Sequence, residues 1–140
     1  MSFLLDTNVI SELRKPAARV EQRVRTWAAQ QPDDVLHLSV ITVMEIEIGV
    51  RRVERRDPVT GALLRSWLTE RVLTRFAERT LPVSLSAARY ASALHVPDPR
   101  PERDALIAAT AAVHGLTVAT RNVADFRVLG VDVIDPWASG

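Results

Sequence analysis

Acidic side chains recur at the ends of predicted strands and at the starts of the helices that follow them. The apolar run 3–5 is typical of a buried strand of a parallel sheet, and Asp6 follows it directly. Glu45 lies one turn into the helix expected after a second strand, and Asp104 lies in the first turn of a later helix. Ligands of open α/β sheets bind outside the carboxyl ends of the strands, so we expect these acids to gather there.

A fourth stretch, 120–126, directly follows another predicted strand and contains Asn122 and Asp125. These two residues are three positions apart, so they can share one side of a helical turn. Gathered carboxylates repel one another and desolvation raises their pKa values, and a cation among them relieves the repulsion. Oxygen ligands without cysteine or paired histidine suit Mg²⁺ or Mn²⁺, which can bind a phosphate and activate water for in-line displacement.

Each acid taken alone also has a purely structural explanation. Asp6 can simply cap the helix that follows it, and Thr42 with Glu45 matches the S/T-x-x-E capping box. Asp104 is favoured by the helix dipole, and the polar residues of the fourth stretch are common turn formers. These explanations do not predict that three or four carboxylates arrive at one edge of the sheet, which is why we favour a metal site.

The elements that must position these acids alternate between strands and helices. After the first strand we expect strands at 35–40, 81–83, 116–120 and 131–134. We expect helices after Asp6, from Pro16 to Gln31, and at about 42–56, 59–79, 86–95 and 104–114, with one turn at 122–126. Pro82 makes the 81–83 strand an edge. Strands separated by helices predict an α/β fold with a parallel sheet covered on both faces.

Composition limits the class of protein without naming its partner. The 140 residues fit one domain, 1–140, with 47% hydrophobic residues for its core. No apolar run approaches the ~20 residues of a membrane helix, and the N-terminus lacks the pattern of a signal peptide. The absence of cysteine excludes disulfides, thiolate zinc sites and cysteine nucleophiles, and it suits a cytoplasmic protein.

Almost every basic residue is an arginine, since Lys15 is the only lysine. Four arginines cluster within a short stretch: Arg51, Arg52, Arg55 and Arg56. Arginine suits bidentate contacts to phosphate, although the same residues also make an ordinary solvated helix face. Arg51, Arg52 and Arg121 are our candidates for nucleic-acid binding.

The motifs described above, taken in order, resemble those of PIN-domain proteins. The resemblance rests on the stretches 4–12, 39–45 with Gly49, 104–111, 120–126 and 135–137. Any one of them is loose, but four motifs in order at these spacings are specific, and they cover essentially the whole chain. The sequence is most similar to the VapC-type toxins of bacterial toxin–antitoxin pairs, and to their FitB-like branch.

This resemblance implies a three-layer α/β/α sandwich with a central, mainly parallel sheet of four to five strands. It implies a Mg²⁺- or Mn²⁺-dependent endoribonuclease that hydrolyses RNA phosphodiester bonds and arrests growth until a cognate antitoxin inhibits it. It also implies a homodimer that acts in the cytoplasm without a membrane.

The family's site residues carry over to positions of this sequence that match its motifs. Asp6, Glu45 and Asp104 are then the core catalytic acids, with Asp6 and Asp104 as direct metal ligands. Glu45 would complete the site through the metal or a bound water, and Thr7 would orient Asp6.

The fourth acid is where this sequence departs from the family. Many PIN domains carry aspartate at the position held here by Asn122, which can ligate weakly but supplies no charge. Asp125 can take over that role, so a second metal is in doubt.

Two other functions compete with the nuclease. A non-catalytic module on the same scaffold would bind nucleic acid or a protein through the arginine-rich helices. A phosphoryl-transfer protein of receiver type would need a lysine near the carboxyl-terminal strands, and none is there. The apolar stripe with Leu63, Trp67 and Leu68 is either a surface for a dimer partner or antitoxin, or plain core packing.

Overall fold

The computed structural model describes residues 1–138, and a five-stranded sheet forms the centre of the molecule. The strands are β1 (Phe3–Leu5), β2 (Leu36–Ser39), β3 (Thr80–Leu81), β4 (Thr117–Ala119) and β5 (Val133–Ile134). They lie in the order β3-β2-β1-β4-β5, and every neighbouring pair is parallel. The predicted α/β fold with a parallel sheet is therefore confirmed, and so is the edge position of the strand near Pro82.

Helices connect these strands and cover both faces of the sheet. They are α1 (Thr7–Arg14), α2 (Gln22–Ala29), α3 (Val40–Arg56), α4 (Pro58–Trp67), α5 (Leu85–Leu94), α6 (Glu102–His114) and α7 (Val123–Arg127), with the short helical segments η1 (Asp33–Val35) and η2 (Leu68–Leu73). Within the described residues, no helix is long and apolar enough to cross a membrane.

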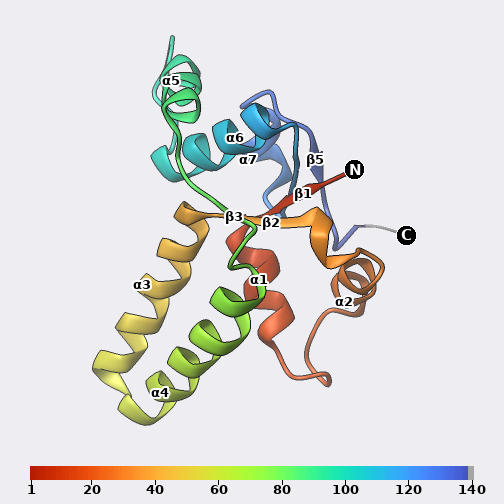
Figure 1. The fold of residues 1–140 in the computed structure, drawn as a ribbon, viewed down its shortest axis with the longest axis vertical. Coiled ribbons are helices and arrows are strands. Elements are labelled where there is room, and N and C mark those ends of the chain that lie inside the picture. Colours follow the sequence, from red (N-terminus) through yellow and green to blue (C-terminus); the bar gives the residue numbers. More distant parts are fainter. Residues whose placement is uncertain (139–140) are drawn as a thin grey trace.

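Side chains that alternate along β1 divide the core into two layers. Phe3 and Leu5 pack on one face with residues of α1, α2, α3 and η2, and Leu4 packs on the other face with α6 and α7. Figure 1 shows these two sets of helices on opposite sides of the strands. The three-layer arrangement follows directly from this alternation.

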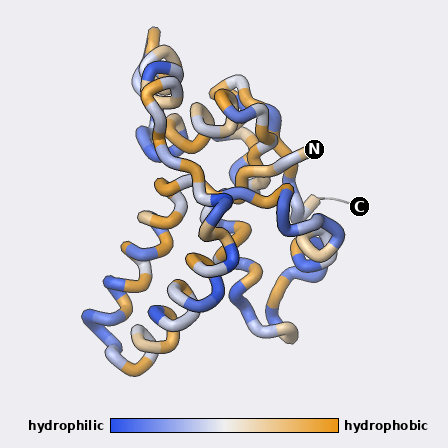
Figure 2. The backbone as a smooth tube through the Cα atoms, viewed as in Figure 1, coloured by the Kyte–Doolittle hydropathy of each residue, from blue (hydrophilic) through white to orange (hydrophobic). Residues whose placement is uncertain are grey.

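Helices α3 and α4 form an antiparallel pair that extends away from the sheet (Figure 1). Gly61 lets the two backbones approach closely, because a Cβ atom there would lie 2.5 Å from Cα of Glu54. Arg65 ties the pair together through ion pairs to Glu54 at 2.8 Å and to Glu47 at 3.1 Å. The last turn of α3 is hydrophilic, whereas the start of α4 is mixed (Figure 2).

Two predicted helices have different limits in the structure. The helix expected to start at Pro16 starts instead at Gln22, because residues 16–19 form a turn and the buried carboxylate of Glu12 binds the backbone N–H of Glu21 at 3.0 Å. The helix expected at 59–79 is α4 followed by the π-helical segment η2, in which the hydrogen-bond spacing widens to i→i+5.

Candidate active site at the carboxyl ends of the strands

Asp6 lies at the carboxyl end of β1, the central strand of the sheet, next to the end of β4. It follows β1 and caps α1, and its Oδ1 accepts a hydrogen bond from the Thr7 backbone N–H at 2.9 Å. Its Oδ2 accepts from the Thr120 hydroxyl at 2.8 Å, and the residue is only 6% exposed. Thr120 follows β4 as Asp6 follows β1, so this bond spans the point where the strand order changes direction. Such switch points are where α/β sheets bind ligands.

Thr120 is a site residue that the sequence analysis did not single out. Its fully buried hydroxyl donates to Asp6 and accepts from the Asn122 backbone N–H at 3.0 Å and from Asn8 Nδ2 at 3.3 Å. Its place directly after a strand, equivalent to that of Asp6, is the sequence signal that could have identified it.

Glu45 reaches the same edge from α3. Its Oε1 accepts a hydrogen bond from the Thr7 hydroxyl at 2.9 Å, so Thr7 positions Glu45 by its side chain and Asp6 by its backbone. The alternative explanation of Glu45 as the partner of Thr42 in a capping box is wrong, because α3 starts at Val40 and Ser39 is its N-cap, with Oγ accepting from the Ile41 backbone N–H. Glu45 therefore does not cap α3, and its carboxylate faces α1.

Asp104 brings a third carboxylate from the first turn of α6. Burial, followed by the negative charges of Asp6, Asp125 and Glu45 in that order, raises the pKa of Asp104 to about 6. Burial also raises the pKa of Asp6, although the hydrogen bonds from Thr120 and Thr7 oppose that shift. The other three predicted catalytic acids are therefore close enough to affect the carboxyl group of Asp104.

The two candidates for the fourth position lie side by side at the start of α7. Asp125 is exposed in the first turn of this helix, and its charge reaches Asp104. Asn122 is the exposed N-cap residue, and it contacts Thr120 through its backbone N–H, not through its side-chain amide. The geometry thus brings the charge of Asp125 into the acidic group and gives Asn122 a backbone contact.

The PIN domain family model matches residues 3–130, which is most of the chain. The chain belongs to the PIN-domain family. It is 37% identical to the VapC ribonuclease Y4jK of Sinorhizobium fredii, over 96% of this chain and 97% of that protein. The resemblance to VapC-type PIN domains is therefore confirmed.

Solved structures agree with this assignment over the whole fold. A chain in the crystal structure of FitAcB from Neisseria gonorrhoeae is 34% identical, with a TM-score of 0.89, covering 98% of this chain and 99% of that one. A chain of a toxin–antitoxin complex from Klebsiella pneumoniae is 27% identical, with a TM-score of 0.66, covering 96% and 98%. The chain thus stands among the VapC- and FitB-type toxins of the PIN-domain family.

Nucleases of the PIN-domain family are typically metal-dependent, and the donor atoms of this PIN domain fit a hard divalent cation. All four acids supply oxygen ligands. The pKa of Asp104 is raised by burial and by the negative charges of the other three acids, and a cation would neutralise those charges. Within residues 1–138, no three acidic or histidine side chains are grouped closely enough to hold a metal ion together. This arrangement suits an ion that binds one or two carboxylates and keeps several of its own waters.

The three arginines predicted to bind nucleic acid have different surroundings in this PIN domain. Arg51 is paired with Glu47 at 2.7 Å, and Arg52 is exposed on α3. Arg121 lies beside the site, with its backbone N–H bonded to Asn8 and its guanidinium 5.4 Å from the centre of the Trp137 ring. Of the three, only Arg121 contacts a residue beside the site, because the amide of Asn8 in turn donates to the Thr120 hydroxyl.

Proposed function

We propose that this PIN domain is a Mg²⁺- or Mn²⁺-dependent endoribonuclease whose metal is held by Asp6 and Asp104. Its class, a ribonuclease toxin of the VapC/FitB type, rests on the full-length relatives. The observation that carries the residue assignment is that Thr7 contacts both Asp6 and Glu45 at the end of β1, and the pKa of Asp104 from α6 is raised by burial and by the charges of these acids and Asp125. A divalent cation is the ligand that turns this repulsion into binding energy.

When bound, the metal supplies positive charge to the scissile phosphate and lowers the pKa of an attacking water. The chain's own contribution is to position the carboxylates. The Thr120 hydroxyl and the Thr7 N–H hold the two oxygens of Asp6 in fixed directions. The Thr7 hydroxyl holds Glu45 at the same edge, where its carboxylate can accept a proton from water.

The substrate that we propose is a phosphodiester bond of RNA, and the test is cleavage of total RNA by purified protein. We expect cleavage in Mn²⁺, none in EDTA, and recovery when Mn²⁺ is restored. Asp6→Asn should abolish cleavage, and Asp98→Asn, an exposed aspartate in the 96–101 loop, should leave it unchanged. Equal cleavage by wild type with and without EDTA would reject the metal.

A non-catalytic module on the same scaffold predicts different results. It would bind RNA with strong salt dependence but would leave the RNA intact in every metal, and Asp6→Asn would not alter its binding. Measuring binding and cleavage on the same samples therefore separates the two functions.

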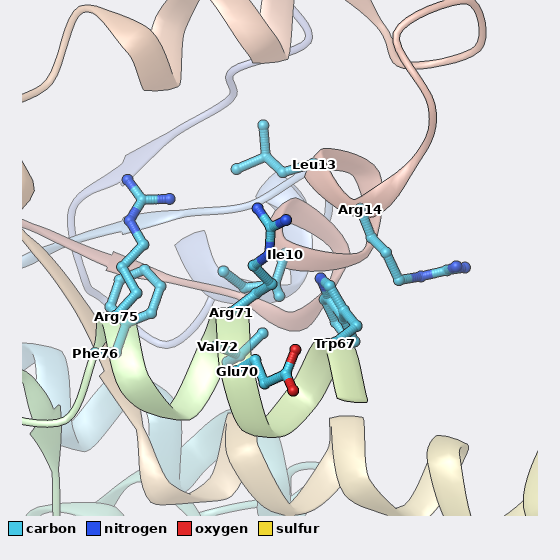
Figure 3. A pocket seen from close by; sticks show the side chains of 9 residues that line it. All are labelled: Ile10, Leu13, Arg14, Trp67, Glu70, Arg71, Val72, Arg75 and Phe76. Carbon is cyan, nitrogen blue, oxygen red and sulfur yellow. The ribbon is translucent and has the colours of Figure 1, made fainter. Parts of the chain in front are cut away.

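We propose an antitoxin as the protein partner, and a groove between α1 and η2 as one of its docking surfaces. The groove has a volume of about 520 Å³ (Figure 3) and is lined by Ile10, Leu13, Arg14, Trp67, Glu70, Arg71, Val72, Arg75 and Phe76. Arg14 lies 5.7 Å from the centre of the Trp67 ring, and Arg75 lies 5.3 Å from that of Phe76. Apolar walls with three guanidinium groups fit a segment that combines apolar and acidic side chains.

This docking surface can be tested by charge reversal. Arg71→Glu with Arg75→Glu should weaken co-purification of the small protein encoded beside the toxin gene, because each change places a negative charge opposite an acidic segment. Arg89→Glu, on exposed α5, is the control for the change in net charge. Unchanged co-purification of the double variant would exclude this groove.

The homodimer and the single domain over 1–140 also remain proposals, as does action in the cytoplasm, where the proposed RNA substrate is found. Only part of the predicted apolar stripe is available to a partner, because Leu68 is buried in the core whereas Leu63 is 70% exposed. Leu63→Asp is therefore the informative variant for light scattering. A dimer that survives this change would remove the α4 surface from the proposed interface.

A further inference from the structure

Arg103 stands at a position where the electrostatics of a helix disfavour a cation. It is in the first turn of α6, where the helix dipole favours acids such as its neighbours Glu102 and Asp104. Its Nη1 lies 3.7 Å from Oε2 of Glu45, the carboxylate whose other oxygen accepts from Thr7. A positive group is thus placed at the border of the proposed metal site.

The contact between Arg103 and Glu45 leaves most of the guanidinium unused. A separation of 3.7 Å is an ion pair but is longer than a hydrogen bond, and the Arg103 side chain is 51% exposed. Among the described residues the guanidinium makes no other ion pair or hydrogen bond, although it carries five N–H donors. Arg65 is the contrast, because it contacts Glu54 at 2.8 Å and Glu47 at 3.1 Å.

An RNA strand that approaches four carboxylates needs a cation beside them, since its phosphates are repelled by the same charges that attract a metal. Arg103 is the arginine that the structure pairs with one of those carboxylates. The planar guanidinium matches a phosphate in a bidentate manner, which the single ammonium of lysine does not.

We propose that Arg103 binds a phosphate of the RNA strand beside the carboxylates, and that its pairing with Glu45 is a resting contact released when a divalent cation neutralises Glu45. This inference rests on the proposed nuclease function. It assigns two opposite effects to one side chain, because Arg103 competes with the metal for the acids and assists the RNA.

The experiment measures metal binding and RNA binding separately in Arg103→Ala. Mn²⁺ binding is measured by calorimetry without RNA, and we expect it to tighten about three- to tenfold because a positive charge has left the site. RNA binding is measured by fluorescence anisotropy of a labelled twelve-nucleotide RNA of mixed sequence, with Ca²⁺ in place of Mn²⁺. It should weaken about tenfold, and the salt dependence of log K should become less steep by about 0.7.

Two variants serve as controls for this experiment. Arg103→Lys keeps the charge, so its Mn²⁺ affinity and salt dependence should match the wild type while RNA binding recovers in part. Arg89→Ala removes an exposed arginine on α5 and should change neither measurement.

Arg103→Ala with wild-type RNA affinity and salt dependence, or with weaker Mn²⁺ binding, would overturn the inference. A lower Tm with both affinities unchanged would also overturn it, because Arg103 would then have only a structural role. These failures differ from failure of the nuclease function itself, in which wild type would not cleave RNA in Mn²⁺ and Asp6→Asn would behave as wild type.

Discussion

Asp6 and Asp104 reach the same edge of the sheet but are held there in different ways. Asp6 is buried, and both of its oxygens accept hydrogen bonds, from Thr120 and Thr7. Asp104 is half-buried and no described residue donates a hydrogen bond to its carboxylate, while burial and the charges of three other acids raise its pKa. The first carboxylate is therefore fixed before any ligand binds, and the second is held at an electrostatic disadvantage that a ligand can relieve.

The two halves of the site thus contribute different things, fixed direction from one and charge from the other. The half built on β1 and β4 has its direction set by short hydrogen bonds between strand ends. The half built on α6 and α7 contributes charge from exposed or half-exposed helix starts. Such a combination gives a site with one rigid ligand and one that can move toward a metal.

The largest expected effect comes from Asp104→Asn. It should lower cleavage by more than ~100-fold, since even a partner of a metal ligand is worth 10–100-fold. Without metal it should raise the Tm, because a nearly isosteric change removes repulsion from three acids. Asp6→Asn should also abolish cleavage but should lower the Tm. The amide NH₂ group cannot accept a hydrogen bond, so either Thr7 or Thr120 would lose its acceptor. Parallel Tm shifts in EDTA for the two variants would contradict the comparison.

The next effect concerns the side chain that fixes Asp6. Thr120→Val keeps the shape of the residue but leaves Oδ2 of buried Asp6 without its donor. We expect a 10–100-fold loss of Mn²⁺ affinity and a stability loss of about 1–3 kcal/mol. Thr120→Ser restores the hydroxyl and should restore both quantities in large part, as measured by Mn²⁺ titration and urea unfolding. A Thr120→Val protein with wild-type Mn²⁺ affinity would show that Asp6 needs no positioning.

The sequence was sufficient to predict the parallel sheet and which acids meet at its edge. Apolar runs that end in a polar residue mark strand ends, and parallel strands bring those ends together. It could not predict how the acids are held, because the bond between Thr120 and Asp6 joins residues 114 positions apart. Hydrogen bonds between neighbouring strand ends depend on register, which the apolar pattern of so short a strand does not define.

The start of α3 shows a second limit of sequence patterns. The predicted strand ran to Val40 and the predicted helix began at about Thr42, which made Thr42 look like the N-cap and Glu45 its capping-box partner. In the structure the strand ends at Ser39, and its hydroxyl caps the helix instead. β-branched residues are common in strands but tolerated in the first turn of a packed helix, so tertiary packing decides between these alternatives.

A smaller effect is expected on the stability of the metal-free protein as a function of pH. An acid whose pKa rises on folding, from 3.8 to about 6 for Asp104, stabilises the fold fully below pH 3.8 and loses that contribution as the pH rises through 6. Solvent screening of this half-buried group reduces the effect to about 1 kcal/mol, or about 2–5 °C in Tm. The Tm difference between Asp104→Asn and wild type in EDTA should therefore widen between pH 4.5 and 7.5. Saturating Mn²⁺ at pH 7 should reduce this difference, and a constant difference across the pH range would contradict the assignment.

The smallest effect separates Asp125 from Asn122, the two candidates on the α7 side. Asp125 contributes a charge that reaches Asp104, whereas Asn122 contributes a backbone N–H that any residue provides. Asp125→Asn should therefore lower cleavage several-fold, and raising Mn²⁺ should partly restore it, because a lost charge weakens ion binding more than it alters the bound geometry.

Asn122→Ala keeps the N–H to Thr120 and should change cleavage less than Asp125→Asn does at every Mn²⁺ concentration. The dependence of stability on pH in metal-free protein adds a second measurement. Removing the charge of Asp125 should lower the pKa of Asp104, so the pH at which the contribution of Asp104 to stability is lost should also fall. If Asn122→Ala has the larger loss and Asp125→Asn leaves the profile in place, the amide of Asn122 is the fourth member of the site, and α7 acts through a neutral ligand.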